Sequence, residues 1–386
     1  MFVRITNIHL LVGLLLLLFL LFSTWKKLET HNKGGSTSAS AKNHVLILST
    51  WRSGSTFAGQ LFNQHPEVFY LMEPAKHIWN SMRWGSPELL QGALRDLLHS
   101  VFLCDMEALR PYISYPSRVS HLFMWSMSRG LCSPPACEVF NRSDIVDSKK
   151  CEAQCGHAPF EKISEACTTY NHVAVKTVRL FQLEALFPLL TDPMLHLHII
   201  HLVRDPRAIY ASRQIVSLLP DDQFIDNSIN STPDTRRIMY KICHSQVEIY
   251  LAALYRMPLA LRGRYQLTRY EDLVGDPLGH LAKWYHFTGL TSSPRIQDWV
   301  YNITHWPTTS DQTEPLSIQK NAKLVSQAWR QQLRFQEVQD VQAICKEAME
   351  VFGYKLMASE EEQRDLSLDP ILPMNKMKSP TKEKQV

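Results

Sequence analysis

The stretch His44-Val-Leu-Ile-Leu-Ser-Thr-Trp-Arg-Ser-Gly-Ser-Thr56 decides the fold. Residues 44–48 form a short, largely apolar run that predicts a buried strand, and the apolar spacing of Phe57–Phe62 predicts the first turns of a helix. Free backbone N–H groups and the helix dipole favour an anion at such a junction. The connecting residues are rich in hydroxyl groups and include one cation. They therefore predict an anion-binding loop made by Ser49, Thr50, Trp51, Arg52, Ser53, Gly54, Ser55 and Thr56.

This loop lacks the pattern of a Walker P-loop. It has no Gly-x4-Gly-Lys-Ser/Thr, whose glycine spacing wraps a triphosphate, and no aspartate elsewhere is an obvious Mg²⁺ ligand. A short Ser/Thr loop with one cation suits a single phosphate or phosphosulfate group. We therefore expect no metal in the site, and a nucleotide kinase is disfavoured.

A second candidate anion-binding element follows the strongest predicted strand, Leu197–Val203. Arg204 stands at the end of this strand, and Ser212 lies about two helical turns further on. Asp205 as N-cap and Pro206 at the first helical position predict a helix start. Arginine suits bidentate phosphate recognition. The alternative is that Asp205 and Pro206 only cap a helix and that Arg204 is a solvated surface charge.

Strands and helices alternate between residue 44 and about residue 290. Further strands are predicted at 172–179 and 265–270, and helices at 94–106, 122–131, 183–190, 238–261, 271–289 and over most of 324–354. This alternation predicts an α/β fold with a parallel sheet flanked by helices on both faces. Because such sheets bind ligands at the carboxyl ends of their strands, both anion-binding elements are expected at one edge.

The composition allows a large core and restricts the partners. With 386 residues and 45% hydrophobic content, the chain can bury one big domain or two small ones. The net charge of +4 is compatible with an anionic ligand. It is far from the clustered basicity of a nucleic-acid binder, so no nucleic-acid partner is predicted.

The N-terminus is apolar from Ile5 to Phe22. Extended to Trp25 as a helix, it would span roughly 30 Å, which is enough for a bilayer core. We expect a cytoplasmic tail at 1–4, a transmembrane signal anchor at 5–25 and a flexible stem at 26–43. A cleaved signal peptide is the alternative, but its best cleavage site, Ala39-Ser-Ala41, lies too far downstream. The flanking charges argue against an N-in orientation, whereas the sequons and cysteines that follow favour it.

Three sequons and eight cysteines lie downstream of this segment. The sequons begin at Asn141, Asn230 and Asn302, and we expect these asparagines to be glycosylated in a lumen. Five cysteines crowd into residues 132–167, which predicts disulfides that staple an irregular excursion, with open connectivity. Zinc is the rival, since Cys132-x4-Cys137 and Cys151-x3-Cys155 resemble loose ligand pairs without Cys-x2-Cys spacing.

The motifs together resemble the Golgi carbohydrate sulfotransferases. Ser49-Thr-Trp-Arg-Ser-Gly-Ser-Thr-Phe57 resembles their 5′-phosphosulfate loop, and Leu202-Val-Arg-Asp-Pro-Arg-Ala208 with Ser212 resembles their 3′-phosphate element. Supporting matches are Phe69–Ala75, Val101–Asp105, Arg269–Leu273 and Ser326–Arg330. The resemblance covers most of 44–355 and is closest to the galactose, N-acetylgalactosamine and N-acetylglucosamine 6-O-sulfotransferases, particularly the high-endothelial and mucin-type N-acetylglucosamine enzymes. These are single-pass type II Golgi proteins with a nucleotide-kinase-like fold.

This resemblance implies 3′-phosphoadenylyl sulfate (PAPS) as the co-substrate and no metal. Residues 49–56 would hold its 5′-phosphosulfate, while Arg204 and Ser212, in one element with Asp205, Pro206 and Arg207, would hold its 3′-phosphate. Many cytosolic relatives carry a lysine at the position of Arg52. Arg52 keeps the positive charge of that lysine but cannot shuttle a proton.

A general base for the attacking sugar hydroxyl is a separate prediction. We favour Glu73, in a strand-to-turn segment that precedes Pro74 and should lie near the loop; alternatively, it only caps the following turn. His77, His201 and Glu271 are lesser candidates. Lys176 and Arg179 are expected to contact substrate or phosphosulfate, or otherwise to pair with carboxylates.

The resemblance implies a lumenal sulfotransferase domain at 44–355, in a type II Golgi membrane protein, followed by a mobile tail at 356–386. Its expected reaction is sulfation of the 6-hydroxyl of N-acetylglucosamine on glycoprotein glycans, such as mucin-type O-glycans and N-glycans. The same chemistry on galactose or N-acetylgalactosamine of keratan or chondroitin chains is the alternative. A membrane-anchored glycan-binding protein with a degenerate nucleotide site is a third hypothesis. A homo-oligomer is compatible with the sequence.

Overall fold

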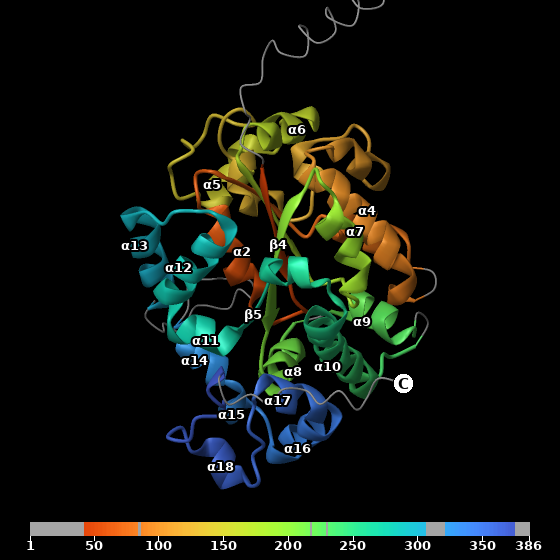
Figure 1. Ribbon diagram of the computed structural model, residues 1–386, viewed down its shortest axis with the longest axis vertical. Coiled ribbons are helices and arrows are strands. Elements are labelled where there is room, and N and C mark those ends of the chain that lie inside the picture. The colour runs from red at the N-terminus through yellow and green to blue at the C-terminus, as the bar shows by residue number, and fades with distance from the viewer. Residues whose placement is uncertain (1–41, 84–85, 217, 229–230, 306–320, 375–386) are drawn as a thin grey trace, which may run out of the picture. The chain divides into compact units, whose positions relative to one another are not determined.

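Five parallel strands, in the order β2-β3-β1-β4-β5, form the central sheet in the computed structural model (Figure 1). They are β1 (Asn43–Leu48), β2 (Val68–Met72), β3 (His172–Thr177), β4 (His196–Val203) and β5 (Tyr265–Arg269). The structure describes residues 42–83, 86–216, 218–228, 231–305 and 321–374. The predicted parallel sheet flanked by helices is confirmed.

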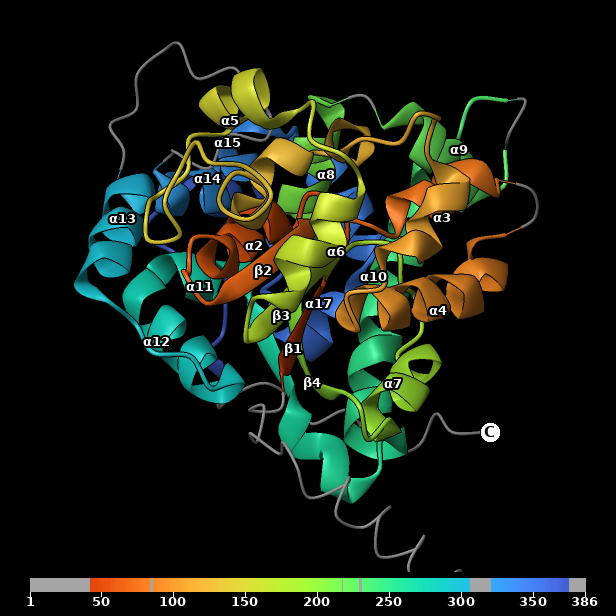
Figure 2. The ribbon, with the colours of Figure 1, turned by 90° about the horizontal axis from the view of Figure 1, so that it is seen from above.

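The side chains of β1 alternate between two separate apolar cores. Leu46 and Leu48 lie in one core, and Val45 and Ile47 lie in the other, as expected when both faces of a parallel sheet are covered. The second core is completed by α2 (Ser55–Asn63), α12 (Pro277–Thr288) and α13 (Pro294–Thr304). The first is covered by α4 (Gln91–Phe102), α7 (Phe187–Thr191) and α10 (Thr235–Leu251). Figures 1 and 2 show these two groups of helices on opposite sides of the sheet.

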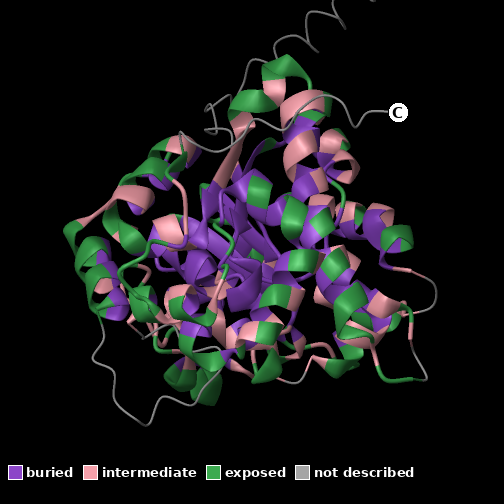
Figure 3. Cartoon of the chain, turned by 90° about the horizontal axis from the view of Figure 1, so that it is seen from below, coloured by how far each residue is buried: buried purple, intermediate pink, exposed green. Residues whose placement is uncertain are grey.

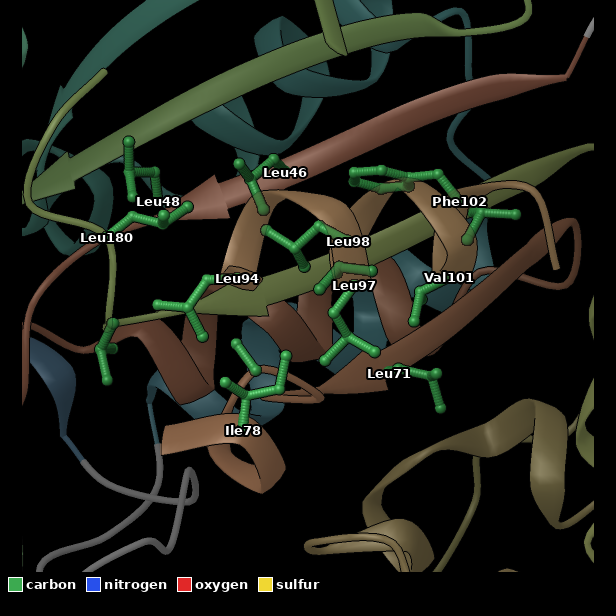
Figure 4. Close-up of a cluster of buried hydrophobic side chains, with 14 of the residues drawn as sticks. Leu46, Leu48, Leu71, Ile78, Leu94, Leu97, Leu98, Val101, Phe102 and Leu180 are labelled. Carbon is green, nitrogen blue, oxygen red and sulfur yellow. The ribbon is translucent and has the colours of Figure 1, made fainter. Parts of the chain in front are cut away.

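Helix α4 illustrates how a helical period becomes a packed face. Leu94, Leu97, Leu98, Val101 and Phe102 recur at the spacing of one helix face, and all five are buried. Figure 4 shows them directed toward Leu46 and Leu48 of β1 and Leu71 of β2. Each fully buried apolar side chain of this size contributes about 1.5–3 kcal/mol. Across the domain, buried residues gather on the sheet and on the inner sides of the helices (Figure 3).

The remaining α-helices of the described residues connect or cover these layers. They are α3 (Lys76–Ser81), α5 (Ser148–Cys155), α6 (Glu161–Thr168), α8 (Pro206–Gln214), α9 (Leu219–Asp226), α11 (Tyr270–Gly275), α14 (Ala322–Gln327), α15 (Trp329–Gln332), α16 (Phe335–Ile344), α17 (Lys346–Phe352) and α18 (Glu360–Arg364).

Three predicted helices differ from the structure. Residues 122–131 contain two short 3₁₀ turns, Trp125–Met127 and Arg129–Leu131, rather than a helix, because Met124 adopts a left-handed φ of 50° immediately before the first turn. The helix predicted at 238–261 ends at Leu251 and continues as a π turn, and Pro258 precludes a regular continuation. The helix predicted at 271–289 is two helices, α11 and α12, because Pro277 starts a new one.

All eight cysteines form disulfides, which confirms the prediction of disulfides over zinc. The pairs within the excursion are Cys132–Cys151 and Cys137–Cys155, and Cys104–Cys167 and Cys243–Cys345 tie distant segments. The last pair joins α10 to the start of α17 across 102 residues. A loop of this length corresponds to about 4–5 kcal/mol of stabilisation in the chain-entropy treatment.

The C-terminal segment differs from the expected mobile tail as far as Met374. It includes α18, and a β-bridge joins Tyr354 to Ile371. The buried guanidinium of Arg330 donates to the carbonyls of four residues of this segment, and that of Arg269 donates to the carbonyl of Leu372. Buried arginines from elsewhere in the chain hold the segment through its backbone carbonyls. The polar side chains of the segment therefore gave no sign that it packs against the domain.

Several predictions concern residues outside the described ranges. The transmembrane segment at 5–25 and the sequon at Asn230 lie there, as do the tail at 1–4 and nearly all of the stem. Within the described ranges, no helix combines the length and apolarity that crossing a membrane requires. Asn141 and Asn302 are exposed, which glycosylation requires.

Candidate functional site

The loop that follows β1 lies at the carboxyl edge of the sheet. Ser49 N–H donates to the Thr177 carbonyl of β3 (3.1 Å), and its hydroxyl donates to the Leu202 carbonyl of β4 (2.7 Å), so Ser49 joins three strands. Arg52 and Gly54 adopt left-handed φ angles of 67° and 85°. A Cβ on Gly54 would approach the Tyr270 ring to 2.3 Å, so this position requires glycine on two counts.

Several polar groups of this loop are free to meet a ligand. The first N–H groups of a helix have no intrahelical acceptor. In α2, which begins at Ser55, no side chain caps them. Among the described residues, the buried hydroxyls of Thr50 and Ser53 have no hydrogen-bond partner. Buried polar groups are seldom unsatisfied. The loop therefore has polar groups that can meet an anion.

The second element meets the loop directly. Arg52 Nε donates to Ser212 Oγ (2.9 Å), and Arg204 donates to the Arg52 carbonyl (2.8 Å). Arg204 is buried with its guanidinium 4.6 Å from the centre of the Tyr270 ring, and its Nε has no partner among the described residues. Burial, followed by the charge of Arg204, lowers the pKa of Arg52. These two cations are close because the carboxyl ends of β1 and β4 are adjacent.

The contacts of Asp205 and Arg207 are with other parts of the protein, and Pro206 starts helix α8. Asp205 caps α8 through Arg207 N–H (2.9 Å) and pairs with the Arg207 guanidinium (2.8 Å). Arg207 is fully buried, stacks on Trp329 and also donates to Gln342 and to the Lys355 carbonyl. The observed contacts of Asp205 and Pro206 are therefore those of a helix start, which was the alternative to anion binding. For Arg204 the alternative, a solvated surface charge, is wrong, because its side chain is buried.

Glu73 lies at the end of β2, where its N–H donates to the Lys176 carbonyl (3.0 Å). Its carboxylate forms ion pairs with Lys176 Nζ and with the Arg179 guanidinium, and all three side chains are buried. Lys176 and Arg179 thus pair with a carboxylate, which was the alternative to substrate contact. That carboxylate belongs to Glu73, the candidate base. Burial, followed by the charge of Arg52, lowers the pKa of Lys176 to about 7.

The backbone of Glu73 is also unusual. Its φ is 52°, a left-handed value that costs a non-glycine residue of order 1–3 kcal/mol. Such conformations persist where surrounding contacts determine them, and the two ion pairs of Glu73 provide such contacts. Glu73 and Arg52 are two of the five described non-glycine residues with positive φ.

Asp221 completes this arrangement and was missed from the sequence. It accepts hydrogen bonds from Trp51 Nε1 (2.8 Å), Trp79 Nε1 (3.0 Å) and Arg179 (3.2 Å). The Arg179 guanidinium lies 5.4 Å and 5.7 Å from the two indole rings. Asp221 therefore orients the arginine that pairs with Glu73. The one available signal was that buried indoles need acceptors, whereas nothing in the polar composition around Asp221 indicates burial.

The three lesser candidates for a base have other contacts. His201 is fully buried, and its ring nitrogens bond to Tyr265 Oη (2.6 Å) and Gln246 Oε1 (2.9 Å). His77 Nε2 accepts from the Phe123 N–H (3.1 Å). Glu271 accepts from the Asp205 N–H (3.0 Å) and from Tyr354 Oη (3.0 Å). None of these contacts involves Lys176 or Arg179, the two cations that link Glu73 to Arg52 and Trp51 of the loop, so Glu73 is kept as the candidate base.

Glu271 leads to a prediction about stability. Burial, followed by the charge of Asp205, raises the pKa of Glu271 from 4.5 to about 7. The folded state therefore binds this proton more tightly than the unfolded chain, so the contribution of Glu271 to stability falls as pH rises from about 4.5 to about 7. Glu271→Gln should raise Tm by a few degrees at about pH 8 and change it little at about pH 4. Thermal unfolding at the two pH values tests this; equal shifts at both would contradict it.

Two further features of the described residues concern ligands. No group of three or more His, Cys, Asp or Glu side chains that could hold a metal ion occurs in those ranges. A cavity of about 820 Å³ lies along β5, bordered by Glu271, Lys323, Ser326 and Gln327 and by residues 366–371. This volume is within the usual range for small-molecule sites.

Comparison with known proteins relates the chain to sulfotransferases. The family model described as "Sulfotransferase domain" matches residues 42–353. "Carbohydrate sulfotransferase 5" of Mus musculus is 48% identical over 336 residues, which cover 86% of this chain and 85% of the relative. "Carbohydrate sulfotransferase 6" of Homo sapiens is 47% identical and covers 86% of each chain, and "Carbohydrate sulfotransferase 4" of Mus musculus is 44% identical and covers 84% and 85%.

A solved structure, "Sulfotransferase Domain from the Synechococcus PCC 7002 Olefin Synthase", has a TM-score of 0.39 and 17% identity, covering 79% of this chain and 96% of that chain. The family model and the three relatives each span most of the sequence. The chain therefore belongs to the sulfotransferase-domain family and, within it, to the carbohydrate sulfotransferases, which transfer sulfate to a sugar.

Proposed function

We propose that the protein transfers sulfate from PAPS to the 6-hydroxyl of N-acetylglucosamine in glycoprotein glycans. The observation that carries this proposal is the meeting of two anion-ready elements with a buried carboxylate at one edge of the sheet. Two hydrogen bonds join the elements, from Arg52 to Ser212 and from Arg204 to the Arg52 carbonyl. Glu73 is linked to them through its ion pair with Lys176, whose pKa is lowered by the charge of Arg52. The carbohydrate relatives support a sugar as the acceptor.

The residues present fit a phosphosulfate nucleotide. Thr50 and Ser53 have buried hydroxyls without partners in the described part of the chain, and the uncapped start of α2 provides N–H donors. Arg204 and Ser212 would hold the 3′-phosphate, and the Nε of Arg204 has no partner among the described residues. PAPS, when bound, supplies the sulfuryl group that is transferred.

The side chains around Glu73 suit this reaction. An ionised Glu73 can accept the proton of the attacking sugar hydroxyl, a contribution of roughly 10²–10⁴-fold. Arg52 and Lys176 supply positive charge beside the loop, where negative charge develops on the leaving group. Arg179, which also pairs with Asp221, forms a second ion pair with the Glu73 carboxylate.

We further propose that the chain is anchored in the Golgi membrane as a type II protein, with the catalytic domain in the lumen. The four disulfides and the exposed sequons at Asn141 and Asn302 support an oxidising, glycosylating compartment. Endoglycosidase digestion of the full-length protein in intact and permeabilised vesicles tests this topology. A mobility shift before permeabilisation would contradict it.

Transfer of ³⁵S-labelled sulfate from PAPS to a panel of defined oligosaccharides tests the reaction. Label at the 6-position of N-acetylglucosamine is the expected result. Label on galactose or N-acetylgalactosamine alone would select the keratan or chondroitin alternative. Binding of PAPS without transfer to any acceptor would overturn the proposal and leave a glycan-binding protein.

Asp221→Asn is expected to lower kcat by about 10- to 100-fold with little change in nucleotide affinity, because a shift of the Arg179–Glu73 pair misplaces the base. Asp222→Asn is the matched control. Asp222 lies on the same helix and pairs with Arg213, without a contact to Arg179. Measured kcat values and binding of 3′-phosphoadenosine 5′-phosphate (PAP) check this. Equal losses in both variants would show that helix α9, and not Asp221, is responsible.

A further inference from the structure

A groove on the surface lies beside the candidate transfer site. It has a volume of about 470 Å³ and runs between Phe181-Gln182 and helix α10. Its other borders include Glu88, Glu248 and Arg256. None of these residues belongs to the anion-binding loop or to the ion pairs of Glu73. Binding of PAPS, the sulfate donor, therefore does not involve them.

The groove has an exposed aromatic surface. Tyr240 is 55% exposed, and its ring is stacked with His244 one turn later, with 7° between the ring planes and 5.5 Å between centroids. Both side chains border the groove. A flat aromatic face matches the C–H face of a pyranose ring, which is apolar while its hydroxyls point outward. An aromatic side chain with a polar tip suits a surface that is apolar at one end and wet at the other.

The polar border of the groove is nearly neutral. Lys241 pairs with Glu88 (3.4 Å), and Arg256 pairs with Glu248 (3.1 Å) and with Glu184. Three carboxylates therefore face two cations. This balance disfavours a strongly anionic or cationic ligand, whereas the carboxylates and guanidinium can accept from and donate to sugar hydroxyls. The charge pattern fits a neutral, polyhydroxylated ligand.

Phe181 connects the groove to the candidate transfer site. Its ring borders the groove and stacks on Trp79, 6.2 Å away with 19° between the planes, and it lies 6.1 Å from Trp51. These two indoles surround Arg179, the partner of Glu73. Along the chain, Gln182 is three residues from Arg179, a span of at most about 10 Å. The separation of the groove from Arg179 is therefore within the length of a short oligosaccharide.

We propose that this groove binds a neutral sugar of the acceptor glycan, a few units away from the sugar that receives sulfate. The inference rests on the proposed function and adds a distal subsite to it. Its consequence is a preference for acceptors long enough to occupy both the groove and the site beside Glu73. Tyr240 supplies the face on which the distal sugar stacks.

A matched control exists on helix α13. Tyr301 and His305 form a stacked pair at the same spacing, with centroids 4.2 Å apart, and Tyr301 is 53% exposed. This pair borders neither the groove nor the cavity along β5. Because both tyrosines are exposed, neither substitution by alanine removes a core contact.

The test compares kcat/KM for a short acceptor, N-acetyllactosamine, with that for the hexasaccharide made of the same repeat. The wild type should prefer the hexasaccharide, and Tyr240→Ala should lower its kcat/KM about 10-fold. The same variant should leave the short acceptor and PAP affinity unchanged, and Tyr301→Ala should leave all three unchanged. Equal losses on both acceptors, no loss, or a wild type without length preference would overturn the subsite.

Direct binding separates this inference from the proposed function. Calorimetric titration with the unsulfated hexasaccharide should show weaker binding to Tyr240→Ala than to the wild type, even if no sulfate transfer is detected. Binding that is equal in the two proteins would overturn the subsite while leaving the transfer reaction untouched.

Discussion

Replacing Glu73 with glutamine is expected to lower kcat for sulfate transfer by about 10²–10⁴-fold and to leave PAP affinity nearly unchanged. Glutamine keeps the shape of the side chain and one acceptor oxygen, but it cannot take a proton from the sugar hydroxyl. Because Glu73 contacts Lys176 and Arg179 rather than the loop at 49–56, nucleotide binding should persist. Single-turnover rates and calorimetric titration with PAP measure the two effects separately.

The same substitution also leaves the buried Lys176 without its carboxylate and Arg179 with Asp221 alone. Removing one partner of a buried ion pair costs about 3–5 kcal/mol, so Tm must be measured together with activity and assays run well below it. Glu271→Gln is the control, since it neutralises a carboxylate at the same sheet edge that contacts Asp205 and Tyr354 instead. A Glu73→Gln enzyme with near-normal kcat would exclude Glu73 as the base.

Replacing Arg204 with alanine is expected to weaken PAP binding by about 10- to 100-fold. Hydrogen bonds to charged groups contribute about 1.5–3 kcal/mol each, and the charge of Arg204 faces the junction of both anion-binding elements. Calorimetry with PAP and with adenosine 5′-monophosphate tests the assignment to the 3′-phosphate. The wild type should prefer PAP, and the variant should lose this preference.

Arg204 also supports the loop, because it donates to the carbonyl of Arg52 and to that of Val325. If the variant loses affinity equally for both nucleotides, its main role is to hold the loop, and the assignment to the 3′-phosphate is wrong. Ser212→Ala offers a milder comparison, since it removes a hydroxyl that accepts from Arg52 but leaves the Arg204 contacts intact.

Local patterns predicted much of the fold and part of the site. Four of the five strands, the start of α8 at Pro206 and the disulfide-bonded state of the cysteines were predictable, because apolar period, caps and composition act over a few residues. The same patterns failed at residues 122–131, where a buried Arg129 donates to the carbonyls of Asn63, His65 and Val68. They also failed at residues 356–374, where distant arginines bind the backbone.

The amino-acid sequence alone was sufficient for the parallel sheet and for the family, since the alternation of strands and helices and the contiguous motifs are visible along the chain. Only the tertiary structure decided that Glu73 pairs with Lys176 and Arg179, that Asp221 holds Arg179, and that Arg207 is internal. The physical reason is separation along the chain. The Trp51–Asp221 hydrogen bond joins residues 170 positions apart, and the partner of a buried charge is determined by the packing of strands and helices, which no local period encodes.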